Sequence, residues 1–533
     1  MDKKILVINL TRFGDLLETQ PLLSGLAANG WQTGLVCLDN FVAATPMMRG
    51  LNDVWPLPGS RILGKLAAAW PEALREILNF ASAIRLEGGY THILNLTLSN
   101  PARLLTRMLA SDGAQTLGFD MDAEGFGRYS GSWAGLFAAT TILRAGSPFN
   151  VADLFRMMAL PLLEGKKPQA DAGLLQQPPA NAGNWAREWL ARYPGATPGK
   201  LVAFQLGASN PVRQWPVENF VALGRALAEK GYCPVLLGSA AEKNLAEEFS
   251  RAADFTHVDA TGQTDIPQLA ALLKNCELLV TNDTGTMHLA SGLGVPILAF
   301  FLATAQPWDT GPYSVGNCCL EPAIDCHPCS FNDYCSQGNK CLGKIAPEYA
   351  ISLALAFLEN GDWSGGVTEA MRENVRVWQT TRDECGFASL ISLSGHEREN
   401  RGAWLAWQRW FWRQTLDDMA GYPSACSVAV PRVQMDNKYR DKIAPTLLSA
   451  AKAMESLRGV APLVGKNPRA GKILLDGCEK IQTIFDLCEP LRVFAFYWKQ
   501  MRNANIDIAA FGHDLAIMAA NMKNFAARLE AGT

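Results

Sequence analysis

The residues best suited to chemistry lie in one segment, Cys276–Phe301, which reads CELLVTNDTGTMHLASGLGVPILAFF. Its apolar run at 278–280 predicts a strand buried on both faces, and 296–300 predicts the next strand. Between them a polar turn at 282–284 precedes a predicted helix over 287–293. Such a turn lies at the carboxyl edge of a parallel sheet, where the free N–H groups and the dipole of the helix favour phosphate.

Small and polar side chains fill this turn. Thr284, Gly285 and Thr286 would let a ligand approach the backbone, while Asp283 adds a carboxylate. His288, four residues after Thr284, is expected on the same side of the first helical turn. The alternative is that Asp283 and Thr284 only cap the helix.

A second polar loop follows the first predicted strand of the chain, Ile5–Ile8. After the loop at 11–14, a predicted helix begins near Asp15, and Pro21 should kink or restart it. Gly14 permits close approach of the backbone, and Asp15 would present a carboxylate at the carboxyl edge of the sheet. Taken alone, Asp15 is better explained as a helix N-cap.

Three further candidate residues follow strands of a second alternating block. The predicted strand at 202–206 ends in a Gly-Ala-Ser turn that contains Ser209, and Arg213 follows it. An arginine can bind two phosphate oxygens at once. Glu242 follows the predicted strand at 234–239, where it would accept from ribose hydroxyls or, alternatively, interact with a helix dipole.

These motifs, in this order, resemble glycosyltransferase family 9, the ADP-heptose heptosyltransferases. The resemblance is carried by D-T-G-x-x-H-L-A from Asp283, G-A-S-x-x-x-R-x-W-P from Gly207, and the strand–loop–Gly-Asp arrangement before Asp15. Asn150–Phe155 and Thr310-Gly311-Pro312 also fit the family. The resemblance extends from residue 3 to about residue 358. It implies an α/β fold of GT-B architecture, with two Rossmann-like domains facing a cleft.

The resemblance implies roles for these residues in an inverting transfer. Asp15 would be the general base, and Arg12 would contact the acceptor. Metal would not be required for the chemistry, because Arg213 and the helix terminus would meet the charge on the departing ADP. His288 would bind a phosphate or lock the turn. The implied donor-binding set is Ser209, Arg213, Glu242, Asp283, Thr284, Gly285, Thr286 and His288.

Four of the thirteen cysteines are clustered as Cys326-x2-Cys329-x5-Cys335-x5-Cys341, within a segment at 318–344. In a reducing compartment this spacing suits tetrahedral zinc or iron better than disulfides. Similar clusters occur in a subset of the resembled family, including protein heptosyltransferases that bind iron there. We expect a structural metal site; four unligated thiols are the alternative.

The alternation of predicted strands and helices indicates two doubly wound domains, at 1–170 and 198–360, joined by a connection rich in proline and glycine. The remainder, 367–533, is expected to be a mostly helical accessory domain that binds a partner or forms a homo-oligomer. Its predicted helices are 401–419, 437–457, 471–502 and 504–530, after strand-like alternation at 375–393.

Composition excludes several classes of protein. A net charge of −3 with 19% charged residues does not favour a nucleic-acid partner. There is no G-x-G-x-x-G after a strand and no P-loop motif, which argues against dinucleotide oxidoreductases and P-loop enzymes. No secretory signal or membrane span is visible, so we expect a cytoplasmic protein. Peripheral contact with the inner membrane stays open through Trp404, Trp407, Trp410 and Trp412, although such spacing is commoner in a core or interface.

Three functions are consistent with the sequence. The first is an inverting glycosyltransferase that transfers heptose from ADP-heptose to the lipopolysaccharide inner core. The second is a protein O-heptosyltransferase that acts on hydroxyls of an adhesin or another protein. The third is a catalytically inactive metal-binding scaffold, against which the intact Asp15, Arg213 and Asp283-Thr284-Gly285 set argues.

Overall fold

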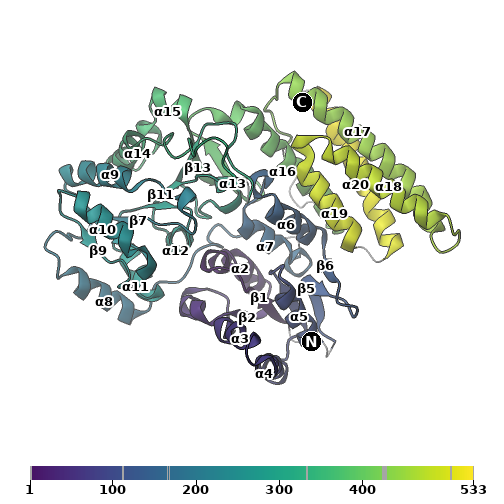
Figure 1. Ribbon diagram of the computed structural model, residues 1–533, viewed down its shortest axis with the longest axis horizontal. Helices are drawn as coiled ribbons and strands as arrows, with labels where there is room; N and C mark the ends of the chain where they lie inside the picture. Colours follow the sequence, from purple (N-terminus) through teal and green to yellow (C-terminus); the bar gives the residue numbers. More distant parts are fainter. Residues whose placement is uncertain are drawn as a thin grey trace. The chain divides into compact units, whose positions relative to one another are not determined.

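The computed structural model describes residues 3–110, 113–164, 166, 168–331, 334–422, 429–504 and 507–531. The chain forms two compact units (Figure 1). The first contains Met1–Thr91, Asn150–Arg156 and Pro168–His396, and the second contains His92–Phe149, Met157–Lys167 and Glu397–Thr533.

The first sheet has the strand order β3-β2-β1-β4-β5-β6. Its strands are β1 (Lys4–Ile8), β2 (Gln32–Leu38), β3 (Asp53–Leu57), β4 (His92–Asn95), β5 (Gln115–Met121) and β6 (Gly127–Ser130). β1, β2 and β3 pair in parallel, with Ile8 opposite Val36, and β6 pairs antiparallel to β5. β1 is buried on both faces, as its unbroken apolar run predicts.

The helix after β1 is divided in two. α1 (Phe13–Leu17) ends early, and α2 (Gln20–Ala28) starts with Pro21 in its first turn, so the predicted restart at Pro21 is confirmed. The other helices before the second sheet are α3 (Gly59–Leu66), α4 (Trp70–Gly88), α5 (Asn100–Leu109), α6 (Ser132–Ile142), α7 (Val151–Met157) and α8 (Ala180–Leu190).

The second sheet has the order β14-β13-β12-β11-β10-β7-β8-β9. Its strands are β7 (Leu201–Gln205), β8 (Cys233–Leu237), β9 (Val258–Asp259), β10 (Leu278–Asn282), β11 (Ile297–Phe300), β12 (Cys318–Pro322), β13 (Val375–Arg382) and β14 (Ala388–Ser392). Across the sheet, the neighbouring strands β9, β8, β7, β10, β11 and β12 all pair in parallel. β13 pairs antiparallel to β12, and β14 pairs antiparallel to β13. The same sheet therefore continues past residue 360, where the predicted second domain ends.

Aromatic packing anchors this sheet on one face. Trp215 stacks on Phe300 of β11 with 4.1 Å between ring centroids, and Phe220 and Phe204 pack beside them. The helices of this region are α9 (Val217–Glu229), α10 (Lys243–Ala252), α11 (Ile266–Leu273), α12 (Gly285–Leu293), α13 (Pro307–Thr310), α14 (Pro347–Asn360) and α15 (Glu369–Asn374). Two sheets rich in parallel strands, each with helices, confirm the predicted α/β fold class.

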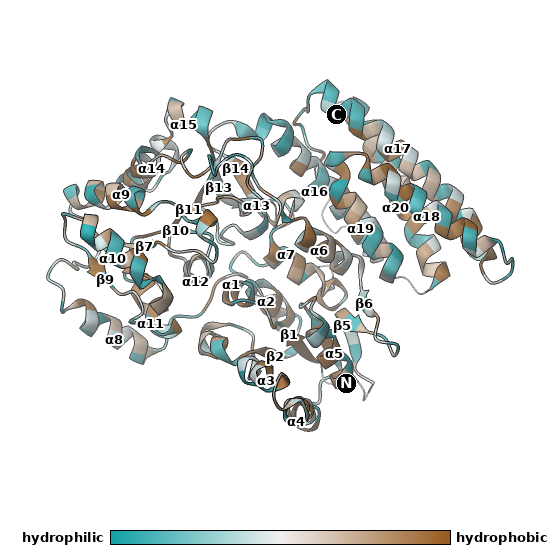
Figure 2. Ribbon diagram, in the orientation of Figure 1, coloured by the Kyte–Doolittle hydropathy of each residue, from teal (hydrophilic) through white to brown (hydrophobic). Residues whose placement is uncertain are grey.

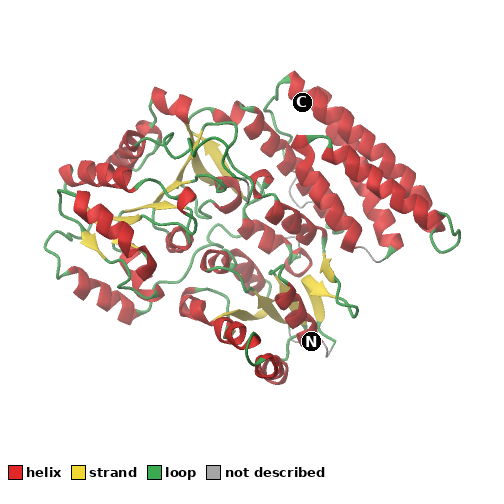
Figure 3. Cartoon of the chain, in the orientation of Figure 1, coloured by secondary structure: helices red, strands yellow, loops and turns green. Residues whose placement is uncertain are grey.

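The last part of the chain is helical, with no strand among its described residues from 397 to 531 (Figure 3). It contains α16 (Asn400–Met419), α17 (Asn437–Val460), α18 (Ala470–Asp486), α19 (Arg492–Ala504) and α20 (Ile508–Ala531). Brown and teal residues alternate along α17, α18 and α20, as expected for helices with one apolar face (Figure 2). The prediction of one helix over 471–502 is wrong: a short 3-10 turn at Glu489–Leu491 interrupts it, because Pro490 cannot continue the α-helical hydrogen bonding.

The tryptophan-rich segment of α16 belongs to the core. Trp404, Trp407, Trp410 and Trp412 are all buried, and Trp412 is fully inaccessible. This outcome favours the core alternative over membrane contact through these rings. Among the helices of the described residues, none is both long enough and apolar enough to cross a membrane.

Candidate active site

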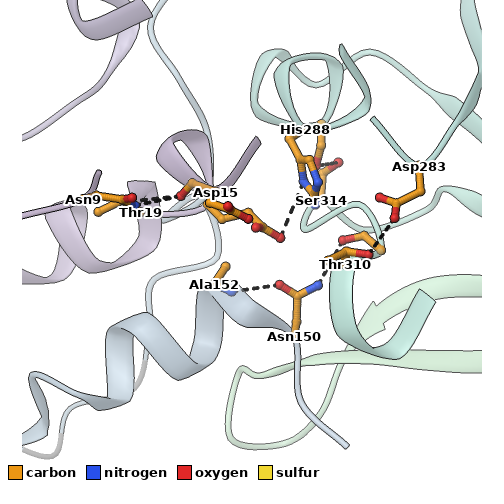
Figure 4. Close-up of polar contacts among 12 residues, drawn as sticks. Asn9, Asp15, Thr19, Asn150, Ala152, Asp283, His288, Thr310 and Ser314 are labelled. Carbon is orange, nitrogen blue, oxygen red and sulfur yellow. Dashed lines mark hydrogen bonds and ion pairs between the residues drawn. The ribbon is translucent and has the colours of Figure 1, made fainter. Parts of the chain in front are cut away.

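Asp15 is held by its backbone within residues 9–19, the segment between β1 and α2 that includes the short helix α1. We call this segment the Asp15 loop. The carbonyl oxygen of Asp15 accepts from Asn9 Nδ2 at 3.1 Å and from Thr19 Oγ1 at 3.2 Å, and Asn9 Nδ2 also donates to Thr19 Oγ1 at 2.8 Å (Figure 4). The carboxylate itself accepts from the N–H of Arg12 at a long 3.3 Å. Over the part of the chain that the structure describes, no cation pairs with this half-buried carboxylate. Asp15 therefore makes a weak helix-start contact and keeps acceptor capacity.

The turn after β10 is built around a buried ion pair. The guanidinium of Arg213 contacts the carboxylate of Asp283, and both side chains are less than a tenth exposed. Thr310 Oγ1 donates to the same Asp283 oxygen at 3.2 Å (Figure 4), and Arg213 Nη1 lies 3.5 Å from Ser209 Oγ. Arg213 Nε is buried and, among the described residues, finds no acceptor. One donor of this guanidinium is thus left without a partner among the described residues.

A buried glutamine joins the start of α12 to Glu242, the carboxylate that was predicted to accept from ribose hydroxyls. Gln205, the last residue of β7, accepts from Thr286 Oγ1 at 3.0 Å and donates from Nε2 to Glu242 at 2.8 Å. Glu242 also accepts from the N–H and hydroxyl of Ser239 at 2.7 and 2.8 Å, so it closes a capping box. It lies so close to the backbone of Gly207 that a β-carbon there would overlap it. The helix-start alternative for Glu242 is therefore realised, and the carboxylate still lies beside the turn after β7.

Asn282 has a role that the sequence did not indicate. The N-cap of α12 is Thr284, whereas Asn282 is fully buried at the end of β10. Its Nδ2 donates to the carbonyl of Leu206 at 2.8 Å, and its Oδ1 accepts from the N–H of Trp215 at 2.8 Å. Asn282 thereby fixes the turn after β7 against the turn after β10. A polar residue that closes an otherwise apolar strand is the signal that would have suggested this.

The loop of Asp15 and the turn of Asp283 meet at two glycines. A β-carbon on Gly14 would lie 2.8 Å from Cδ2 of His288, and one on Gly285 would lie 2.6 Å from Cδ1 of Phe13. His288 is buried, and its Nδ1 lies 3.6 Å from Oε1 of Glu18. His288 therefore contacts the Asp15 loop and reaches Glu18 on the following turn.

The structure brings together most of the residues chosen from the sequence. Ser209, Arg213 and Asp283 form one cluster, and Gln205 connects it with Thr286 and Glu242. Arg12 differs from them, because its side chain is exposed. Gln205, Asn282 and Thr310 complete the cluster and were not among the predicted site residues.

The four-cysteine segment does not form a closed ligand set. In the described residues no three His, Cys, Asp or Glu side chains are arranged to hold a metal ion. Cys326 is exposed and Cys341 is buried, and burial raises the pKa of Cys341. Backbone N–H donors lower the pKa of Cys335, first among them that of Asn339. Among the described residues the four thiols are therefore not gathered into one metal site.

Comparison with known proteins agrees with this geometry. Residues 87–339 match glycosyltransferase family 9 (heptosyltransferase). The lipooligosaccharide heptosyltransferase 2 of Haemophilus influenzae is 32% identical over 120 residues, which are 21% of this chain and 34% of that protein. The lipopolysaccharide heptosyltransferase 1 of Pseudomonas aeruginosa is 31% identical over 155 residues, 28% of this chain and 42% of that protein. The chain thus aligns with about a third to two fifths of the length of these relatives.

A solved structure extends the likeness of the fold. The crystal structure of the glycosyl transferase family 9 protein from Veillonella parvula has a TM-score of 0.53 and 20% identity, and the match covers 67% of this chain and 98% of that one. The family match contains Ser209, Arg213, Glu242 and the whole turn from Asp283 to His288, and it begins after Asp15. Residues 87–339, just under half of this chain, are thus similar to glycosyltransferase family 9, the heptosyltransferases.

Proposed function

We propose that the chain is an inverting glycosyltransferase that transfers heptose from ADP-heptose to an acceptor hydroxyl of the lipopolysaccharide inner core. The observation that carries the proposal is the meeting of two loops: the one that bears Asp15 approaches the turn of Asp283 through Gly14 and His288. This approach would bring a general base next to a seat for the donor diphosphate. The names of the partial relatives support the same reaction.

The donor diphosphate would bind at the start of α12. Thr284, Gly285 and Thr286 offer backbone N–H groups there, and the guanidinium of Arg213, held by Asp283, would supply positive charge beside them. Ser209 is exposed beside Arg213 and would add a hydroxyl. As the bond to the sugar breaks, negative charge develops on the leaving phosphate, and fixed donors stabilise it without reorganisation.

Asp283 supports the cluster indirectly. Its carboxylate is occupied by Arg213 and Thr310, so it holds the guanidinium in place and does not itself approach an anionic ligand. Glu242 would accept from the ribose hydroxyls of the adenosine, with Gln205 fixing its orientation relative to Thr286. His288 would fix the first turn of α12 against the Asp15 loop.

Asp15 would act as the general base. Its carboxylate would take the proton of the acceptor hydroxyl while the oxygen attacks the anomeric carbon from the face opposite ADP, which gives inversion. A carboxylate with one long hydrogen bond and no cationic partner among the described residues retains lone pairs for that proton. The exposed Arg12 beside it would contact an anionic acceptor.

The experiment is an acceptor comparison with purified protein and ADP-heptose, followed by ADP release and mass spectrometry of the acceptor. We expect stoichiometric ADP release and addition of one heptose to deacylated inner-core oligosaccharide. Transfer to a purified adhesin instead, with no reaction on the oligosaccharide, would replace the acceptor by protein hydroxyls. No ADP release with either acceptor, in excess of the rate with water, would contradict the proposal and favour an inactive scaffold.

We also propose that Cys326, Cys329, Cys335 and Cys341 hold a structural zinc or iron ion. Their spacing in the sequence supports it. Bound metal would join the loop at both ends, since the first and last ligands lie fifteen positions apart in sequence. Metal analysis of protein purified without added metal should give about one equivalent of zinc or iron, lost in a Cys326→Ser/Cys341→Ser variant. Less than a tenth of an equivalent of either metal would refute the site.

A further inference from the structure

Two segments that resemble the family contain residues with no part in the mechanism above. One is the start of α7, with Asn150 and Asp153, and the other is the loop after α13, with Gly311 and Tyr313. They are about 160 residues apart in the sequence and in direct contact in the first compact unit. Asn150 Nδ2 donates to the carbonyl of Gly311 at 2.9 Å, while its Oδ1 accepts from the N–H of Ala152 at 3.0 Å (Figure 4).

Asp153 makes the deeper contact. Its side chain is buried, Oδ1 accepts from the hydroxyl of Tyr313 at 2.8 Å, and Oδ2 accepts from the N–H of Ala388 at 2.8 Å. Burial raises the pKa of Asp153, whereas the charge of Arg382 and the bond from Tyr313 act in the opposite direction. Both oxygens of this carboxylate are therefore used to join three parts of the chain.

The third part is the hairpin of β13 and β14, which lies beyond the residues matched to the family. Arg382, at the end of β13, lies 3.6 Å from the ring centroid of Tyr313 and donates from Nη2 to the carbonyl of Tyr313 at 2.6 Å. The first residue of β14, Ala388, supplies the N–H that Asp153 accepts. The hairpin thus holds Tyr313 on one side while α7 holds it on the other.

The same loop reaches the donor site at its other end. Thr310 donates to the Asp283 oxygen that Arg213 contacts, three residues before Tyr313. The N–H of Ser314 donates to Ser291 Oγ of α12 at 2.9 Å. Residues 310–314 therefore connect Asp153 with both the buried ion pair and the helix whose start would bind the diphosphate.

We propose that Asp153 is a positioning residue for the donor site: it fixes the loop at 310–313 so that Thr310 orients Asp283, and Asp283 in turn orients Arg213. This inference rests on the proposed function, because it concerns how the donor diphosphate is held. Without the hydrogen bond from Thr310, the Asp283 carboxylate could rotate and follow the guanidinium toward several geometries. The hydrogen bonds of Asp153 remove that freedom before the donor arrives.

The test compares Asp153→Asn and Tyr313→Phe with the wild type. The asparagine loses one acceptor and would direct an NH2 group at a donor, while the phenylalanine keeps the ring under Arg382 and removes only the hydroxyl. We expect Asp153→Asn to raise the Kd for ADP and the KM for ADP-heptose about tenfold, and Tyr313→Phe to raise them by about threefold, at unchanged KM for the acceptor. Asp254→Asn, at a surface pair with Arg225, is the matched control and should change none of these constants.

The outcomes separate the inference from the proposed function. Wild-type protein that does not bind ADP would contradict both together. Wild-type binding with an unchanged Kd and donor KM in both variants would overturn the positioning role alone, even if their Tm falls. An equal rise in donor and acceptor KM would also overturn it, because it would indicate general loosening of the protein. Should Asp153→Asn fail to fold, Tyr313→Phe decides by the same constants.

Discussion

Asp15 and Asp283 each follow a buried parallel strand, but their carboxylates are held in different ways. Asp15 is fixed through its carbonyl oxygen, and its carboxylate accepts a single 3.3 Å bond from Arg12 N–H. The Asp283 carboxylate is buried against Arg213 and also accepts from Thr310. At Asp15 the protein orders the backbone and leaves the carboxylate accessible. At Asp283 the carboxylate itself is fully engaged by Arg213 and Thr310.

This difference separates a reactive carboxylate from a supporting one. A general base must accept a proton, so it needs an oxygen that is not already occupied by a strong donor. A carboxylate in a buried ion pair cannot be protonated without leaving its partner charge uncompensated. The geometry therefore assigns opposite consequences to the loss of each: Asp15 should matter for rate, and Asp283 for folding and donor binding.

The largest effect is expected for Asp15→Asn. The amide keeps the size of the side chain and an oxygen for the Arg12 N–H, but it cannot take the proton, so the rate of transfer should fall by about 10³-fold. The free energy of unfolding should change by no more than about 0.5 kcal/mol, because no ion pair is lost. Rate measurements at saturating donor, together with ADP calorimetry, check both parts. A variant that keeps more than a tenth of the wild-type rate would remove Asp15 from the role of base.

Asp283→Ala should, in contrast, lower the stability of the protein and its binding of ADP. It leaves the buried guanidinium of Arg213 without its counter-charge, which costs about 3–5 kcal/mol of the free energy of unfolding. Chemical unfolding measures this directly. The matched double variant Asp283→Ala/Arg213→Met removes both charges, and we expect it to recover at least half of the lost stability while still failing to bind ADP. Equal destabilisation by Asp15→Asn and Asp283→Ala would erase the contrast between the two sites.

Arg213→Lys sharpens the same contrast with a smaller change. Lysine keeps a positive charge for Asp283 but lacks the planar fork that reaches a second oxygen at the same time. We expect the free energy of unfolding to fall by about 1 kcal/mol and the affinity for ADP to fall about tenfold, as expected when a charge-assisted hydrogen bond is lost. Calorimetric titration with ADP measures the second effect. Unchanged affinity would mean that Arg213 serves only Asp283.

The strands and turns of the site could be predicted because their signals are local. Buried apolar runs ending in polar residues placed Asp15, Ser209 and Asp283 after strands, and all three lie there. Pro21 likewise predicted that a new helix would start at this point. By contrast, the helical spacing of apolar residues continues on both sides of Pro490. This spacing predicted one helix, although the chain breaks there between α18 and α19.

What the sequence did not provide is the pairing between distant residues. Arg213 and Asp283 were both selected as donor ligands, but 70 positions separate them and no local pattern indicates that they neutralise each other. The bonds of Asn282 to Leu206 and Trp215 likewise arise only when β7 and β10 become neighbours. Tertiary hydrogen bonds of this kind require the strand order, which periodicity does not specify.

The smallest expected effect tests the contact between the two loops. In Gly14→Ala the new β-carbon would lie 2.8 Å from Cδ2 of His288, and the ring has little room to move because it is buried beside Glu18. Overpacking of this kind costs about 1–3 kcal/mol of the free energy of unfolding, and a shifted Asp15 loop should reduce transfer by a few-fold to about tenfold. Gly64→Ala is the matched control, because Gly64 has no atom within 4 Å of the added carbon. If the overlap with His288 is the cause, His288→Ala in the Gly14→Ala background should restore stability; if stability is not restored, the defect lies in the backbone of the loop and the two carboxylates are positioned independently.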